Sequence, residues 1–176
     1  MKSSINVYFK NLSMLLASPG SFFSVSLCRE TPAGAFWFLL ISGIVFTSLT
    51  LFMNPDSRVP LTAGILLLNA LGMTLIASVV GYGVMVMTLG KRISFLRFFT
   101  IHAFASGVTL LAAWIPFFII ITEPWRWWLV GIGLIKAGSL GKLQAFFNVV
   151  LSISIITLFF WSCLPVLSSV SGGGPL

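Results

Sequence analysis

Charged residues are scarce in this sequence. Only 7% of its 176 residues are Asp, Glu, Lys or Arg, whereas 58% are apolar. A soluble domain carries about 25% charged and about 45–50% apolar residues, so the composition excludes that class. It also excludes an intrinsically disordered chain, which is polar and strongly charged. The sequence therefore predicts an integral membrane protein.

The residues that usually carry catalysis or bind metals are almost missing. Cys28 and Cys163 have neither metal-ligand spacing nor the pattern of a disulfide framework, and His102 is the only histidine. Glu30 is predicted on the cytoplasmic side of the membrane and Asp56 and Glu123 on the outer side, which argues against catalysis by paired carboxylates. We expect no enzyme, no catalytic residue, no metal site and no cofactor.

Basic residues outnumber acidic ones and give a net charge of +7. They are dispersed between apolar segments and form no basic stripe, so we exclude nucleic acid as a partner. Their positions are interpreted as topology signals instead.

Five apolar segments are long enough, or nearly so, to cross the roughly 30 Å of a bilayer's hydrocarbon core. We therefore predict an all-α polytopic membrane protein, a five-transmembrane-helix bundle over residues 34–167. Pro116 is expected to kink the third helix, and the fourth is the shortest and spans only if Lys136 snorkels to the headgroups. The predicted helices are residues 34–53, 61–89, 98–122, 125–141 and 144–167.

Residues 1–33 precede the first crossing and read as cytoplasmic, amphipathic interfacial helices. Apolar residues recur there at helical spacing, and Ser18–Pro19 is typical of a helix start. Residues 168–176 are predicted to be a flexible tail. The residues expected at the membrane interface are Tyr8, Phe9, Leu12, Leu15 and Leu16 in the first helix, and Trp125, Trp127 and Trp128 in an aromatic belt.

The distribution of Lys and Arg predicts the orientation of the chain, because cytoplasmic loops are enriched in both. With the N-terminus in the cytoplasm, eight basic residues lie inside and only Arg58 and Arg126 outside. Five crossings then place the C-terminus outside. We expect a multi-pass protein of the plasma (inner) membrane.

Two sets of residues within the crossings invite a functional interpretation. Small residues four apart, Ala77 with Gly81 and Ala103 with Gly107, are typical of helix-packing faces, either within the chain or with a partner. The polar residues would have to converge for the bundle to hold a polar cavity. They are Asn69, Tyr82, His102 and Asn148.

The order of short motifs resembles the Yip-domain family, integral membrane proteins that interact with Rab/Ypt GTPases, in its short prokaryotic form. The motifs are Ser18-Pro19-Gly20-Ser21-Phe22-Phe23, Leu89-Gly90-Lys91-Arg92-Ile93-Ser94-Phe95, Ile101-His102-Ala103-Phe104-Ala105-Ser106, Ile115-Pro116, and Leu140-Gly141-Lys142-Leu143-Gln144-Ala145. The resemblance implies five helices and action through partners or membrane shape. The Asp-Leu-Tyr-Gly-Pro motif of eukaryotic members is matched only at Pro19, so Rab binding is not carried over.

We therefore expect a non-enzymatic integral membrane scaffold or accessory subunit. It would act by helix packing with itself as a homo-oligomer or with other membrane-protein subunits, in contact with the lipid bilayer. One alternative is a small transporter or channel, which needs the polar cavity. Another is a membrane subunit of an electron-transfer complex, in which His102 would ligate haem together with a residue of another chain.

Overall fold

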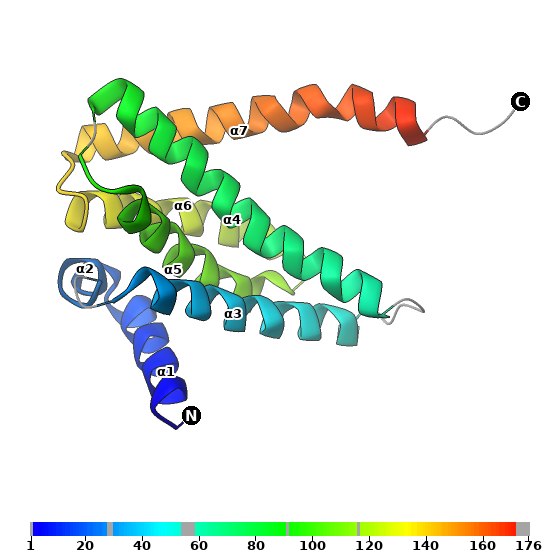
Figure 1. Cartoon of the computed structure of the whole chain (residues 1–176), viewed down its shortest axis with the longest axis horizontal. Coiled ribbons are helices and arrows are strands. Elements are labelled where there is room, and N and C mark those ends of the chain that lie inside the picture. Colours follow the sequence, from blue (N-terminus) through cyan, green and yellow to red (C-terminus); the bar gives the residue numbers. More distant parts are fainter. Residues whose placement is uncertain (1, 28–29, 54–58, 91, 116, 172–176) are drawn as a thin grey trace, which may run out of the picture.

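The computed structural model describes residues 2–27, 30–53, 59–90, 92–115 and 117–171. Over these ranges the chain is helical and holds no strand, in agreement with the predicted all-α class. Figure 1 shows long helices that run back and forth side by side, with α1 lying across their direction at one end. The elements are α1 (Lys2–Ala17), α2 (Pro19–Ser21), the π-helix η1 (Phe22–Ser26), α3 (Pro32–Met53), α4 (Val59–Leu89), α5 (Phe95–Ala113), α6 (Ile119–Lys136) and α7 (Lys142–Ser171).

Helix α5 is the centre of the bundle. Every residue from Thr100 to Thr109 is buried, and α5 packs against α3, α4 and α6 (Figure 1). A helix that is buried all round must present side chains that fit between helices on every face. The alternation of large and small residues, such as Phe104 beside Ala103 and Ala105, meets that need. The fold therefore places α5 where α3, α4 and α6 all pack against it.

Four helices within the described ranges, α3, α4, α5 and α7, are long and apolar enough to cross a membrane. This finding agrees with the predicted membrane protein. Helix α6 is not among them, because its 18 residues include Glu123, Arg126 and Lys136.

The turn between α5 and α6 differs from the sequence prediction. A single helix was expected over 98–122 and the next over 125–141, but α5 ends at Ala113 and α6 begins at Ile119. The backbone φ of Phe117 is +66°, which no α-helix accommodates. The predicted kink at Pro116 lies outside the described residues. The sequence alone still explains part of the break, since a residue before proline disfavours helical geometry.

The later boundaries also shift. Helix α6 stops at Lys136 rather than 141, because the amide of Gly138 turns back to the Gly133 carbonyl at 3.2 Å and Ser139 has a φ of +54°. This is a left-handed helix end. Helix α7 continues to Ser171, so residues 168–171 of the predicted flexible tail are helical. Residues 172–176 lie outside the described ranges.

The N-terminal segment closes one end of the bundle. Pro19 opens α2 at its first turn, a position where its missing N–H is harmless. Phe22 and Phe23 follow and are completely buried, with the Phe22 ring 4.9 Å from the Phe104 ring of α5. The segment is therefore anchored to the core helix by its aromatic side chains.

The predicted small residues face neighbours within the chain. Ala77 and Ala103 are buried. A Cβ placed on Gly81 would come within 3.0 Å of the Phe98 ring, and one on Gly107 within 2.7 Å of the Phe38 ring. Lipid does not drive helices together hydrophobically, so such close approach supplies the packing.

The Gly107 contact generates a stability prediction. We expect Gly107→Ala to lower stability by about 1–3 kcal/mol, because Phe38 is enclosed by Tyr8 and Phe104 and has nowhere to move. Thermal unfolding in mild detergent measures the change. Gly131→Ala is the control, since its Cβ would meet nothing within 4 Å. A Gly107→Ala protein that melts no lower than wild type would contradict this packing.

Candidate functional site

A cleft of about 820 Å³ is bounded by α4, α5, α6 and α7, with Phe46 of α3 at its edge. Ligand sites in proteins usually measure about 300–1,000 Å³ and combine apolar walls with a few polar groups. This cleft has that character. Its apolar residues include Met73, Leu110, Phe146, Val149, Ile153 and Ile156, and its polar residues are Asn69, Thr74, Ser106, Thr109, Thr122, Glu123, Arg126 and Thr157.

Arg126 is the more buried of the two charged residues in the cleft, the other being Glu123. Its side chain is 13% exposed, and one terminal nitrogen, Nη2, lies 3.2 Å from Oε2 of Glu123. The guanidinium carbon also lies 5.1 Å from the ring centre of Trp127, a cation–π distance. Its Nε atom is buried and has no hydrogen-bond partner among the described residues. A guanidinium carries five N–H groups, so this arginine retains unused donors.

Ser106 of α5 is the second unsatisfied group in the cleft. It is 3% exposed, and its hydroxyl has no partner among the residues described, although its own carbonyl accepts a hydrogen bond from Thr109 at 3.0 Å. Buried polar atoms nearly always have partners, so each exception needs an explanation.

The four residues predicted to form a polar cavity are not brought together. Asn69 lines the cleft. Tyr82 packs its ring against Phe95 and Phe98, and the Asn148 side chain donates to the Gly81 carbonyl at 3.1 Å. His102 is buried, stacked on Phe98 and edge-on to Trp127. Only Asn69 of the four therefore belongs to the cleft.

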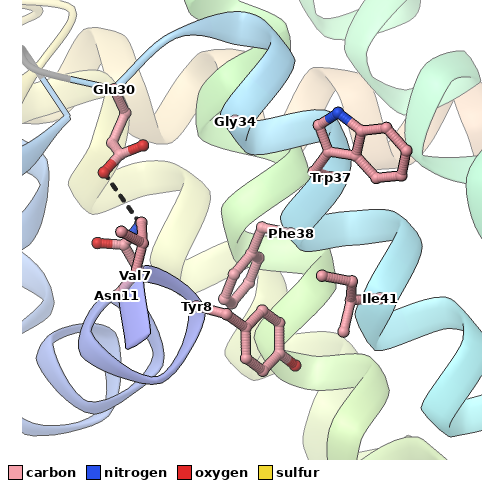
Figure 2. A pocket seen from close by; sticks show the side chains of 8 residues that line it. All are labelled: Val7, Tyr8, Asn11, Glu30, Gly34, Trp37, Phe38 and Ile41. Carbon is pink, nitrogen blue, oxygen red and sulfur yellow. Dashed lines mark hydrogen bonds between the residues drawn. The ribbon is translucent and has the colours of Figure 1, made fainter. Parts of the chain in front are cut away.

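A smaller cavity of about 460 Å³ separates α1 from the first part of α3 (Figure 2). Two polar contacts fix α1 beside it. The Asn11 amide donates to Oε1 of Glu30 at 3.0 Å, and the Tyr8 hydroxyl lies 3.0 Å from the Ser42 hydroxyl. Figure 2 shows the Tyr8 and Phe38 rings side by side in this cavity's wall.

The residues predicted for the membrane interface divide into two groups. Tyr8 and Leu15 are buried inside the protein and Leu12 is half-buried, so the bundle covers this part of α1. Phe9 and Leu16 are exposed, at 61% and 54%.

The predicted aromatic belt is likewise split. Trp128 is 56% exposed, whereas Trp125 and Trp127 are half-buried. All three lie inside α6, past its first turn, because that helix begins at Ile119, six residues before the predicted start at residue 125.

Sequence reasoning missed Arg126 as a site residue, since it was placed at the outer end of the predicted helix 125–141. Helix α6 begins earlier, so Arg126 lies inside it, seven residues after Ile119. The signal that could have found it is the i, i+3 spacing of Glu123 and Arg126 beside a tryptophan, which suits one helical face.

Within the described ranges, no three His, Cys, Asp or Glu side chains gather as a metal site requires. Comparisons of the chain with protein-family models, with curated proteins and with solved structures gave no match. The geometry of the chain itself therefore has to indicate the function.

Burial of the Tyr8 hydroxyl predicts that α1 separates from the bundle at high pH. Burial raises the pKa of Tyr8 above its ordinary value of 10.0, and the Ser42 hydrogen bond partly offsets that rise. Because the pKa is higher in the folded state, the stabilisation is complete below pH 10 and is lost as the pH rises through the folded pKa. We expect a fluorophore at Ser13, which is exposed, to report release of α1 above pH 10.

Two variants test this assignment. Tyr8→Phe loses the hydrogen bond, about 0.5–1.5 kcal/mol, and should remove the alkaline release. Tyr82→Phe removes the other tyrosine of the chain and should leave the release in place. Alkaline release that persists in Tyr8→Phe would refute the role of this hydroxyl.

Proposed function

We propose that this chain is a non-enzymatic integral membrane scaffold or accessory subunit that acts by helix packing. It crosses the plasma membrane five times, with its N-terminus in the cytoplasm and its C-terminus outside. A transmembrane helix of a second copy, or of a larger complex, docks on the outer face of α4. The observation that carries the proposal is a stripe on that face with three glycines, at each of which a Cβ would meet no atom of the described chain within 4 Å.

The fifth crossing in this proposal is α6. Its 18 residues extend about 27 Å, close to the roughly 30 Å of the hydrocarbon core. Lys136 is exposed at its end and reaches the headgroups by snorkelling. In Figure 1, α6 returns beside α5, and the start of α1 and the end of α7 lie at opposite ends of the bundle. Both features support an odd number of crossings.

The α4 stripe runs at helical spacing along the outside of the bundle. Its residues are Gly64, Leu68, Gly72, Leu75, Val79 and Gly83, separated by steps of four, four, three, four and four. Steps of three and four keep residues on one face of a helix, and this stripe extends about 28 Å. Leu68, Leu75 and Val79 are exposed, at 73%, 49% and 53%.

The three glycines of the stripe have no packing role within the described chain. A Cβ on any of them would meet nothing within 4 Å. A glycine inside a helix is about 1 kcal/mol less favourable than alanine, so three of them need a compensating contact. Close approach of a partner helix supplies one, as in other small-residue interfaces of membrane helices. Because the same stripe on two copies is self-complementary, we expect a symmetric dimer first.

The cleft favours a second candidate, the small transporter or channel. Asn69, Arg126 and the cleft hydroxyls give such a protein a polar surface between its helices. The electron-transfer alternative depends on His102, whose ring packs against Phe98 and Trp127. An absorbance spectrum with a Soret band would favour it. The resemblance to the Yip-domain family belongs to the main proposal, since it implies five helices and partners.

The topology generates a labelling prediction. Single cysteines at Ser94, Phe117 and Ser139, which are exposed, are introduced after Cys28 and Cys163 are replaced by serine. In intact cells a membrane-impermeant maleimide should label Phe117→Cys and spare the other two. Labelling of Ser139→Cys together with Phe117→Cys would mean that α6 does not cross.

The glycine stripe generates an association prediction. Gly72→Ile and Gly83→Ile put a branched side chain where the backbone of a partner helix would approach. Each should therefore raise the dissociation constant of the dimer in bilayers at least about tenfold. Förster transfer between labelled copies measures it. Gly131→Ile is the matched control on α6, where a Cβ also has open space. If wild type and the three variants associate equally, the stripe is not the self-association interface. If other subunits copurify with wild type but not with Gly72→Ile or Gly83→Ile, the stripe binds a larger complex.

A further inference from the structure

We infer that the cleft between α4, α5, α6 and α7 binds an amphiphile with an anionic head, and that Arg126 holds the phosphate or carboxylate. The site is independent of the α4 stripe, because α4 presents Ala70, Met73 and Thr74 to the cleft from its other side. Failure of the α4 interface therefore leaves this site in place, whereas the depth of Arg126 rests on the proposed crossing of α6.

The first step of the inference is the depth of Arg126. It lies ten residues from Lys136 along α6, which is about 15 Å and thus near the middle of a bilayer about 30 Å thick. A cation at that depth is expensive and usually marks a functional site. Glu123 pairs with only one nitrogen of the guanidinium, because its Oε2 lies 3.2 Å from Nη2 of Arg126. The Nε edge remains without a partner in the described chain.

The second step is the presence of two unused donors in the lining of one cleft. The Arg126 Nε and the Ser106 hydroxyl come from different helices, line the same cleft and both lack partners among the described residues. Guanidinium N–H groups and a hydroxyl are both donors that suit the oxygens of a phosphate or carboxylate. Water also offers acceptor oxygens but carries no charge, whereas an anionic group accepts hydrogen bonds and compensates the buried guanidinium as well.

The third step is the character of the walls. Around these donors the cleft is mainly apolar, with Met73, Leu110, Ile119, Phe146, Ile153 and Ile156 among its residues. A free inorganic anion would gain nothing from such a surface, but an acyl chain would bury against it. The head and walls together therefore select an amphiphile with a negative head.

Glu123 gives the site a built-in competitor. It is the more exposed member of its ion pair, at 46%, and it shares the guanidinium with any bound anion. Removing its charge leaves the arginine without an internal partner. Anion binding should therefore become tighter in Glu123→Gln, an outcome opposite to that of a purely structural ion pair.

The test uses dodecyl phosphate as the probe, with the full chain in dodecyl maltoside, so that chain length is matched and only the head differs. Isothermal titration calorimetry measures the Kd. We expect Arg126→Gln to weaken binding at least about tenfold, Arg126→Lys to restore part of it, and Glu123→Gln to strengthen it. Arg92→Gln is the matched control, since Arg92 is exposed outside the cleft and should change binding less than about twofold.

A second pair of variants covers the case in which Arg126→Gln fails to fold. Ile156→Trp fills the cleft without changing charge and should weaken dodecyl phosphate binding. Leu158→Trp on the same helix lies outside the cleft, is 65% exposed and should have no effect. Circular dichroism and gel filtration report folding for each variant.

Three results would overturn the inference. One is unchanged dodecyl phosphate affinity in Arg126→Gln and in Ile156→Trp. Another is inorganic phosphate binding as tightly as dodecyl phosphate, which would show that the apolar walls contribute nothing. The third is weaker binding in Glu123→Gln, which would assign the ion pair a structural role only.

Discussion

Hydrocarbon offers no hydrogen bonds, and this constraint shapes the whole chain. Backbone groups are satisfied by helices, and most hydroxyls within the crossings bond to a carbonyl of the preceding turn. Ser78 donates to Thr74 at 2.7 Å and Ser152 to Asn148 at 2.6 Å, while Asn148 bridges to α4. Against that background the unused donors of Arg126 and Ser106 stand out. The cleft therefore holds two groups without hydrogen-bond partners in the described chain, and outside the cleft Thr47 and the Nδ1 atom of His102 are further buried polar groups without partners there.

Much of the fold was predictable because charges and turn residues delimit apolar segments. The predicted start of α3 is two residues from the observed one, and its end at Met53 agrees. The α5–α6 boundary was not predictable in this way, since apolar residues continue without a charge from Phe98 to Thr122. The break is instead a backbone event, visible in the positive φ of Phe117. A hydropathy profile shows which segments prefer lipid to water, but it does not mark a turn between two apolar segments.

The site was less predictable than the fold, because it depends on which faces meet. Asn69 and Asn148 are the same residue type in similar crossings, yet one lines the cleft and the other is used in packing. Arg126 follows Glu123 and Pro124, a sequence that resembles a loop, although it lies within α6. Similarly, Tyr8 and Leu15 of α1 belong to an apolar face that suits lipid or protein equally well. Periodicity identifies such a face but does not identify what covers it.

The central position of α5 has a consequence for biosynthesis. Its mean hydropathy is 1.5, against 2.1 for each of the other three membrane-length helices. On the ribosome, α3 and α4 emerge before it, and they form two of the walls that later enclose it. The least hydrophobic of these four helices thus enters the membrane after α3 and α4 are already there. A nascent chain that lacks α3 and α4 would have to insert Thr100, His102 and Ser106 directly into lipid. Removal of α3 should therefore impair the membrane integration of α5, which begins at Phe95, 42 residues after α3 ends at Met53.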